Sequence, residues 1–273
     1  MQYLGGKSKI SRPISEVINE IFRWQEQNKQ GHFANNEQDI GRERERERER
    51  VFVSLFCGTC SIESKVNADV KILNDKHEYL IEMFKALQNG YILPDTITEE
   101  QYKYIRENKD EDKALSGFVG FGCSFGGKWF GGYARNKTGT NYCLQSKKSL
   151  LKDFAGLNNA VFTCLDYKDV KIPENAIVYC DIPYKNTTGY SLGKFDTDEF
   201  WCYNRELSKN NIVLTSEQEA PDDFICIWQK EFVRKLDNVN QNKKIVYEKL
   251  FVHEKYIDIL KGFDIYDYCQ IKV

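Results

Sequence analysis

Residues 181–184, Asp-Ile-Pro-Tyr, have the chemical groups that could activate an aromatic amine. The lone pair of such an amine is delocalised into its ring, which makes the amine a poor nucleophile. The Asp181 carboxylate and the backbone carbonyl of Ile182, both accepting hydrogen bonds from the NH₂ group, would orient that lone pair toward a methyl donor. Pro183 would fix the turn that aims the carbonyl, and Tyr184 would stack on a base that has left its helix.

The residues before Asp181 indicate where this motif lies in a fold. Residues 176–180 are an apolar run that is typical of a buried strand. Open α/β sheets bind their ligands outside the carboxyl ends of the strands, so Asp181 is expected at a site. The alternative interpretation is a strand-to-loop turn in which Asp181 only caps a helix.

A second motif, Phe56-Cys57-Gly58-Thr59-Cys60-Ser61, follows another apolar run. A tight turn at Gly58 lets the backbone approach a ligand at the start of the next helix. Asp75 ends the following predicted strand, roughly where an acid reaches the ribose hydroxyls of a nucleoside in such folds. Cys57 and Cys60 also have C-x-x-C redox spacing, but no second cysteine pair or histidine cluster accompanies them for a zinc site. A nucleoside site is the favoured interpretation.

The N-terminal segment Tyr3-Leu4-Gly5-Gly6-Lys7 is a third candidate. Adjacent glycines followed by a lysine suit a loop that closes over a charged cofactor. Too few residues separate the glycines from Lys7 for a Walker loop, and no strand precedes them.

The charge of the chain is unevenly distributed. The net charge of −2 over 273 residues excludes a globally basic nucleic-acid binder but not a local basic patch. Residues 117–155 contain six basic side chains and one acid, a local charge of +5, among glycines and aromatic residues. Phosphates attract such a patch, and aromatic rings stack on unpaired bases. The candidate DNA-binding residues are Lys128, Trp129, Arg135 and Lys137; the alternative is a glycine-rich surface loop with incidental charge.

The apolar pattern predicts an α/β fold with a mostly parallel, doubly wound sheet. We expect helices over 10–30, 61–66 and 80–87, and strands over 51–56, 70–73, 160–164, 176–180, 211–215, 224–228, 244–251 and 263–273. The last strands lack a clear intervening helix, which predicts an antiparallel hairpin at one edge.

Residues 31–50 differ from the rest of the chain, because a strict Arg-Glu alternation runs from Arg42 to Arg50. We expect a solvated, disordered low-complexity insertion, since like charges would face each other at i,i+4 in a helix; a binding arm is the alternative. The nine cysteines are expected to be reduced and mostly buried. No apolar stretch approaches the roughly 18 residues of a membrane span, and no signal peptide is evident, so we expect a cytoplasmic protein.

These segments, in this order, resemble the Dam-like (alpha-class) adenine DNA methyltransferases. Tyr3 to Lys7 resembles the N-terminal cofactor motif of that family, and Leu55 to Ser61 resembles its Phe-x-Gly-x-Gly loop. Leu73-Asn74-Asp75 resembles the acidic motif, and Cys164 to Tyr167 the segment that flanks the cofactor adenine. Residues 181–184 resemble the Asp-Pro-Pro-Tyr catalytic motif.

The resemblance implies a Rossmann-like catalytic domain over 1–84 and 160–273, with an inserted DNA target-recognition region over 85–159. It implies transfer of a methyl group from S-adenosylmethionine to the N6 amine of an adenine flipped out of double-stranded DNA. The protein would act at the nucleoid, without a metal, a membrane or an obligate protein partner. A partner restriction nuclease is not evident from the sequence. The cofactor residues would be Tyr3, Lys7, Phe56, Gly58, Asp75, Asp166, Tyr167 and Asp181.

Two residues depart from the family pattern. Ile182 replaces the first proline of the catalytic motif, but the motif uses the carbonyl of that residue, which isoleucine also supplies. Cys60 stands where the family has glycine, which puts the affinity for the cofactor in doubt. The remaining alternatives are a cytosine-N4 DNA methyltransferase, an RNA or protein amide methyltransferase, and a catalytically silent DNA-binding homologue.

Overall fold

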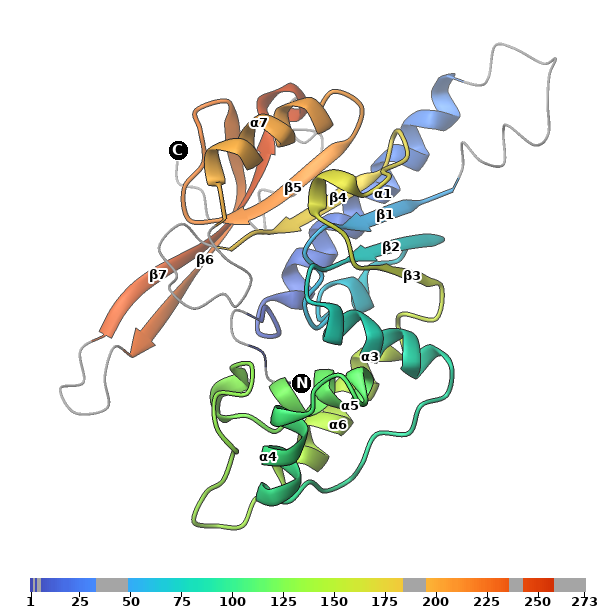
Figure 1. Ribbon diagram of the computed structural model, residues 1–273. Coiled ribbons are helices and arrows are strands. Elements are labelled where there is room, and N and C mark those ends of the chain that lie inside the picture. The colour runs from blue at the N-terminus through green and yellow to red at the C-terminus, as the bar shows by residue number, and fades with distance from the viewer. Residues whose placement is uncertain (2, 4–5, 33–48, 184–194, 236–242, 258–273) are drawn as a thin grey trace. The chain divides into compact units, whose positions relative to one another are not determined.

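A computed structural model describes Met1, Tyr3 and residues 6–32, 49–183, 195–235 and 243–257 (Figure 1). The predicted insertion over 31–50 and the last predicted strand lie largely or wholly outside these residues, as does Tyr184. The helices are α1 (Ser11–His32), α3 (Glu78–Gln88), α4 (Glu99–Glu107), α5 (Lys113–Gly122), α6 (Tyr142–Phe154) and α7 (Thr197–Leu207). Short 3-10 helices are η2 (Glu63–Lys65), η3 (Phe125–Gly127), η4 (Tyr167–Asp169) and η5 (Glu254–Tyr256).

The strands are those that the apolar pattern predicts over the described residues. They are β1 (Val51–Ser54), β2 (Val70–Asn74), β3 (Ala160–Thr163), β4 (Ile177–Asp181), β5 (Ile212–Glu217), β6 (Phe224–Lys235) and β7 (Lys243–His253). The sheet has seven strands in the order β3-β2-β1-β4-β5-β7-β6. The pairs β2–β3 and β4–β5 are parallel, whereas β7 pairs antiparallel with β5 and β6. The predicted α/β class and the antiparallel hairpin at one edge are confirmed.

The described chain forms two compact units, which we describe separately. Unit 1 comprises residues 1–16 and 53–171, and unit 2 comprises residues 17–52 and 172–273. The predicted boundary between a catalytic domain and an inserted region falls inside unit 1, and it stays a prediction.

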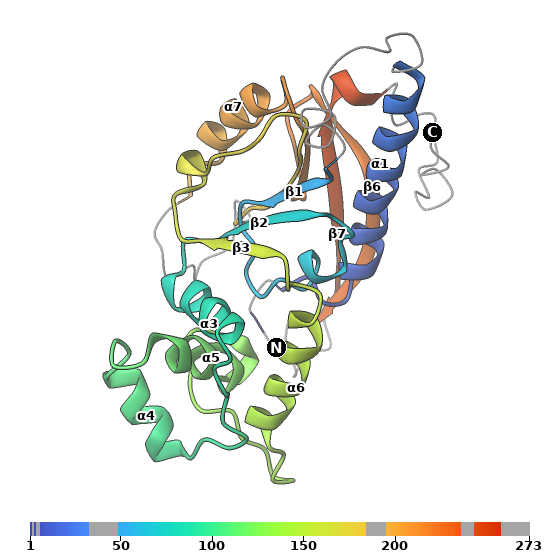
Figure 2. The ribbon, with the colours of Figure 1, turned by 90° about the vertical axis from the view of Figure 1, so that its right-hand side faces the viewer.

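In unit 1 the helix α5 packs against α3, α4 and α6 (Figures 1 and 2). Gly117 of α5 permits this close approach, because a Cβ atom there would lie 2.1 Å from the backbone oxygen of Tyr79 in α3. Phe118, Val119 and Phe121 of the same helix are buried. At residues 117–122 the glycine-rich stretch is therefore a buried helix and not a surface loop, because packing selects glycine in this helix against its low helix propensity.

The helix expected over residues 61–66 is also wrong in extent, because only the 3-10 turn η2 forms there. Cys60, immediately before it, has a left-handed backbone with φ +56°, and Val66 is already extended. Neither residue can continue a right-handed helix, so the chain turns once and runs on to β2.

In unit 2 the parallel pair β4–β5 is held by buried polar side chains as well as by its ladder. The hydroxyl groups of Tyr179 and Ser216 are hydrogen-bonded at 2.8 Å, and Asn204 of α7 donates to Thr215 Oγ1 at 2.8 Å. These bonds satisfy groups that would otherwise be buried without partners. They fix the strand ends from which Asp181 projects.

Among the described residues, no helix combines the length and the hydrophobicity that crossing a membrane requires.

Candidate active site

The turn after β1 in unit 1 is built around the carboxylate of Asp75. Its Oδ2 accepts a hydrogen bond from the backbone N–H of Gly58 at 2.9 Å, and its Oδ1 accepts one from the N–H of His77 at 2.8 Å. Burial raises the pKa of Asp75, and these two hydrogen bonds partly oppose that change. The Gly58 turn and Asp75, which the sequence assigns separately to a nucleoside site, are thus in direct contact in the structure.

Asn74, one residue before Asp75, ties three strand ends together. Its Nδ2 donates to the carbonyls of Leu55 and Leu165, both at 3.1 Å. Its Oδ1 accepts from Thr163 Oγ1 at 2.9 Å and from the N–H of Leu165 at 3.0 Å. The side chain is buried and its hydrogen-bonding capacity is filled, so it fixes the segments that precede Gly58 and Asp166. The motif Leu73-Asn74-Asp75 contains Asn74, but the sequence alone does not indicate its role.

The N-terminal residues lie against the same turn. A Cβ atom on Gly58, whose φ is +49°, would lie 3.3 Å from the ring of Tyr3. The N–H of Gly6 donates to the Tyr3 carbonyl at 2.9 Å, which closes the loop, and Lys7 is buried. The structure therefore places Tyr3 against Gly58, whereas Leu4 and Gly5 lie outside the described residues.

Cys60 stands where the resembled family has glycine, and its backbone has the conformation that favours glycine. Its φ is +56°, its side chain is fully buried, and its N–H donates to the Cys57 carbonyl at 2.8 Å. Burial raises the pKa of both thiols, that of Cys60 to about 11, and the two thiols hydrogen-bond to each other. Thiols with raised pKa values are weak nucleophiles, which argues against a redox-active pair.

This geometry predicts an unusual order of stability. Left-handed backbone costs an L-residue roughly 1–2 kcal/mol, so Cys60→Gly is expected to be more stable than Cys60→Ala by about 1 kcal/mol. Urea unfolding measures the difference. The matched control is Cys143 in α6, where Gly is expected to be less stable than Ala by a similar amount. Equal stability of the two Cys60 variants would contradict the left-handed turn.

The adenine-flanking candidates Asp166 and Tyr167 lie at the start of η4. Asp166 accepts from Lys76 Nζ at 3.0 Å and from the N–H of Lys168 at 3.2 Å. Burial raises the pKa of Asp166, but these interactions outweigh it and the pKa is lowered. The Tyr167 ring is buried and lies 5.5 Å from the ring of Phe56. An anionic carboxylate beside two packed rings suits an adenosine moiety.

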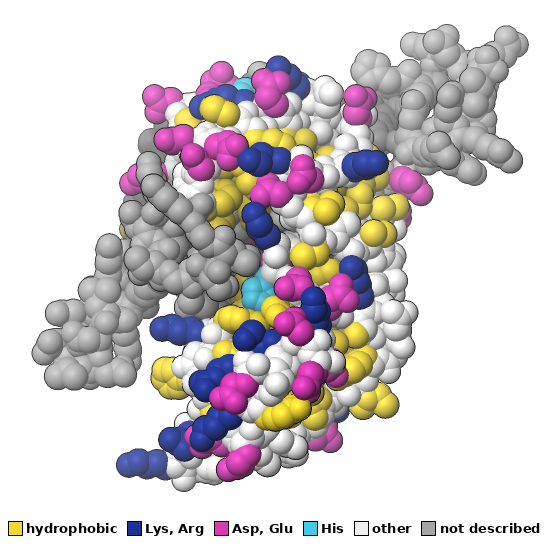
Figure 3. Space-filling view, viewed as in Figure 1, with side chains coloured by type: hydrophobic (Ala, Val, Ile, Leu, Met, Phe, Trp, Pro, Cys, Tyr) yellow, Lys and Arg dark blue, Asp and Glu magenta, His cyan; other side chains and the backbone are white. Residues whose placement is uncertain are grey.

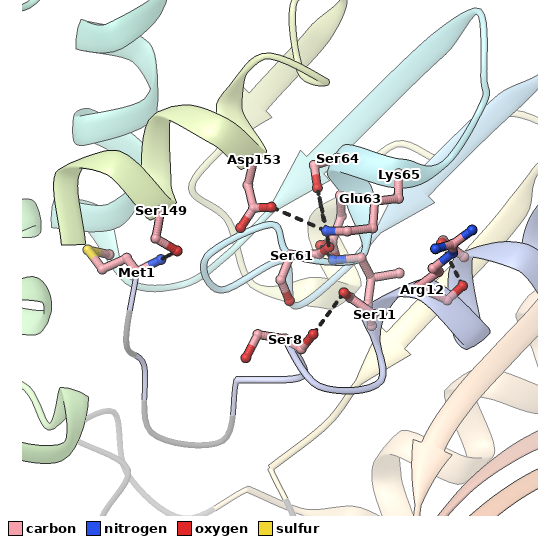
Figure 4. Close-up of polar contacts among 12 residues, drawn as sticks. Met1, Ser8, Ser11, Arg12, Ser61, Glu63, Ser64, Lys65, Ser149 and Asp153 are labelled. Atoms are coloured by element: carbon pink, nitrogen blue, oxygen red, sulfur yellow. Dashed lines mark hydrogen bonds and ion pairs between the residues drawn. The ribbon is translucent and has the colours of Figure 1, made fainter. Parts of the chain in front are cut away.

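The short helix η2, which follows the Gly58 turn along the chain, contacts α6 (Figure 4). Lys65 Nζ donates to the Ser61 carbonyl at 2.6 Å and to Asp153 Oδ1 at 3.2 Å. The buried carboxylate of Glu63 accepts from Ser54 Oγ at 2.8 Å, at the end of β1. These contacts hold the glycine turn to the helices of residues 85–159, and sequence reasoning missed them because Lys65 and Asp153 are far apart along the chain.

The four predicted DNA-binding residues differ in how far their side chains are exposed. Trp129 packs inward: its ring lies 4.4 Å from that of His77 and 4.8 Å from that of Phe121. Lys128, Arg135 and Lys137 are exposed, and Arg135 pairs with Glu99 at 2.8 Å. Figure 3 shows Lys and Arg side chains gathered over this part of unit 1. Phe125 in η3 is an exposed aromatic residue there, with 70% of its surface accessible, which the sequence analysis does not single out.

In unit 2, Asp181 ends β4 after four buried residues and is itself half-buried. Its Cα partner in the parallel pair with β5 is Ser216. Ile182 is buried and Pro183 is half-buried. The position of Asp181 at the carboxyl end of a buried parallel strand agrees with its predicted location.

Residues 3–119 match the family model of D12 class N6 adenine-specific DNA methyltransferases. The matched segment contains the N-terminal loop, the Gly58 turn and Asp75, whose mutual contacts are described above. This segment, which is less than half of the chain, is thus similar to that family.

The D12 class match ends before Asp166, Tyr167 and residues 181–184, so the roles of those residues are proposals. A solved structure of a protein assigned as an RNA methyltransferase, from Pyrococcus horikoshii, is 10% identical to this chain with a TM-score of 0.34. That match covers 75% of this chain and 73% of the other. A similarity at this level carries no argument about substrate.

Proposed function

We propose that this protein is an N6 adenine-specific DNA methyltransferase, which transfers a methyl group from S-adenosylmethionine to the N6 amine of an adenine flipped out of double-stranded DNA. The observation that carries the proposal is the contact of Asp75 with the backbone of Gly58, inside the segment that matches the family. When bound, S-adenosylmethionine supplies a methyl group that its sulfonium already activates.

The residues of unit 1 fit the cofactor. Gly58 keeps the turn free of a side chain where the backbone approaches the ligand, and Asp75 would accept from the ribose hydroxyls through its remaining lone pairs. Asp166 would accept from the adenine amine, with Phe56 and Tyr167 against the ring. Tyr3 would cover the turn, and Lys7 would offer a cation to the carboxylate of the methionine part.

The residues of unit 2 would act on the acceptor. Asp181 would accept a hydrogen bond from the adenine amine and contact the cofactor, and the Ile182 carbonyl would accept from the other N–H. Pro183 would hold that carbonyl in place, and Tyr184 would stack on the flipped base. The proton that the amine loses after transfer would pass to solvent through Asp181.

The DNA would be held by the exposed cations Lys128, Arg135 and Lys137, which supply phosphate contacts without reading sequence. Trp129 stays a candidate, although its packing gives it a structural role, and Phe125 is the aromatic ring that is free to meet a base. The protein would therefore work inside the cell, where it can reach DNA.

Transfer of labelled methyl groups to duplex DNA, followed by digestion to nucleosides, tests the proposal. N6-methyladenine is the expected product. N4-methylcytosine would identify the cytosine alternative, and label in RNA or protein but not DNA would identify the amide alternative. Binding of DNA without any transfer would identify a silent homologue.

A further inference from the structure

His77 connects the Gly58 turn to the loop that carries the proposed DNA contacts. Its backbone N–H donates to Asp75 Oδ1 at 2.8 Å, while the other oxygen of that carboxylate accepts from Gly58 at 2.9 Å. Only 6% of the residue is exposed, and it directly precedes α3. Its backbone therefore belongs to the Gly58 turn, which is the proposed cofactor turn, and its side chain contacts other rings.

The imidazole of His77 lies among the rings of residues 121–130. Its centroid is 4.4 Å from that of Trp129, nearly edge-on at 77°, and 4.9 Å from that of Phe121. Trp129 directly follows Lys128 and is seated on α5, where a Cβ atom on Gly120 would lie 2.3 Å from the indole. A displacement of the cofactor turn would therefore shift the Trp129 side chain, since close-packed interiors transmit strain.

The imidazole of His77 acts in this packing as a neutral ring. In the described part of the chain, its Nδ1 is buried without a hydrogen-bond partner. Burial lowers the pKa of His77 to about 4, so the ring is neutral near pH 7. A buried nitrogen without a partner costs free energy that an apolar residue would avoid. What the side chain contributes among the described residues is its ring contacts with Trp129 and Phe121, which an apolar ring could also make.

Tyr3 provides a second connection between the Gly58 turn and α5. The ring of Tyr3, which covers Gly58, lies 4.9 Å from the ring of Phe121. Phe121 thus touches both Tyr3 and His77. The contacts through His77 and those through Tyr3 therefore both reach Phe121 of α5, which lies near the start of the loop at Lys128.

We propose that His77 is a positioning residue that couples the cofactor turn to the loop of residues 128–137, so that a filled cofactor site raises the affinity for DNA. The inference rests on the proposed function and adds a dependence between its two binding events. Because such coupling is reciprocal, DNA would raise the affinity for the cofactor by the same factor.

The test measures the dissociation constant of a fluorescent DNA duplex with and without saturating S-adenosylhomocysteine, the unreactive product. The ratio of the two constants is the coupling factor. We expect a factor of at least about 5 in the wild type, within the ordinary range for coupled sites. His77→Ala is expected to lower it to below about 2, with the affinity of the cofactor-free protein changed less than about 3-fold.

Three further variants separate positioning from general loss of structure. His77→Phe keeps a ring in contact with Trp129 and is expected to retain most of the coupling. Phe121→Leu interrupts both routes from α5 and is expected to lose it, which gives a second test if His77→Ala does not fold. Tyr104→Ala removes an exposed ring from α4, where 56% of the residue is accessible, and is expected to behave as wild type.

Wild-type coupling in His77→Ala or Phe121→Leu would overturn the inference, as would a wild-type factor near 1 in a protein that binds both ligands. These results leave the proposed function intact. A wild type that binds neither DNA nor S-adenosylhomocysteine would instead overturn the proposed function, and the coupling with it.

Discussion

Replacing Asp181 with alanine is expected to abolish methyl transfer while cofactor affinity is largely retained. Asp181 ends β4 and is only half-buried, so a smaller side chain there is expected to leave the fold intact. What disappears is the carboxylate that would polarise the adenine amine. Removing one such preorganised group costs other enzymes about 10²–10³-fold in kcat, and we expect at least this loss here.

Asp181→Asn sharpens this prediction. An amide oxygen still accepts one hydrogen bond from the amine but carries no charge, so a smaller loss than with alanine is expected. The matched control is Asp198→Asn, an exposed carboxylate in the first turn of α7, which is expected to keep wild-type activity. Single-turnover kinetics with labelled cofactor measure the rates, and calorimetry measures cofactor binding. Wild-type transfer by Asp181→Ala would remove Asp181 from the mechanism.

The strands were predictable from sequence because a buried parallel strand is a continuous apolar run. Val51 to Ser54 and Ile177 to Asp181 show this pattern, and both form strands. A residue at the end of such a strand then lies at the ligand edge, which is why Asp75 and Asp181 could be identified by position. No knowledge of distant contacts was needed for either.

The helices of residues 99–122 were not predictable in the same way. Residues 113–122 contain three glycines, which oppose a helix on propensity alone. They form α5 because Gly117 and Gly120 are the only size that fits against Tyr79 and Trp129. That selection depends on tertiary packing, which a local pattern does not contain.

In the candidate site, too, contacts between neighbouring strand ends were predictable and contacts to distant residues were not. The contact of Gly58 with Asp75 follows from two neighbouring strand ends, whereas the roles of Asn74 and His77 depend on Leu165 and Trp129, far along the chain. Trp129 was expected to face DNA because its neighbours are basic, but its ring packs on α5, and Phe125 is the exposed ring. Composition indicated that basic side chains are exposed here but did not indicate which aromatic ring is exposed near them.

Replacing Asn74 with aspartate is expected to lower the free energy of unfolding by at least about 3 kcal/mol. The carboxylate cannot donate, so the carbonyls of Leu55 and Leu165 each lose a hydrogen bond and face a buried negative charge. Each buried group left without a partner costs roughly 1–3 kcal/mol, and an unpaired buried charge costs more. Protonation of the new carboxyl group would restore one donor, so part of the loss should be recovered as the pH falls.

Asn159 offers a matched control in the same unit. Its Nδ2 also donates to two carbonyls, those of Ala68 and Asp69, at 2.9 and 2.8 Å, but its side chain is exposed. Asn159→Asp is therefore expected to cost less than about 1 kcal/mol, because water can replace the lost bonds. Urea unfolding of both variants measures the difference. Because Leu55 precedes the Gly58 turn and Leu165 precedes Asp166, cofactor affinity should fall only in Asn74→Asp; equal effects of the two variants would mean that the strand ends are held by the sheet alone.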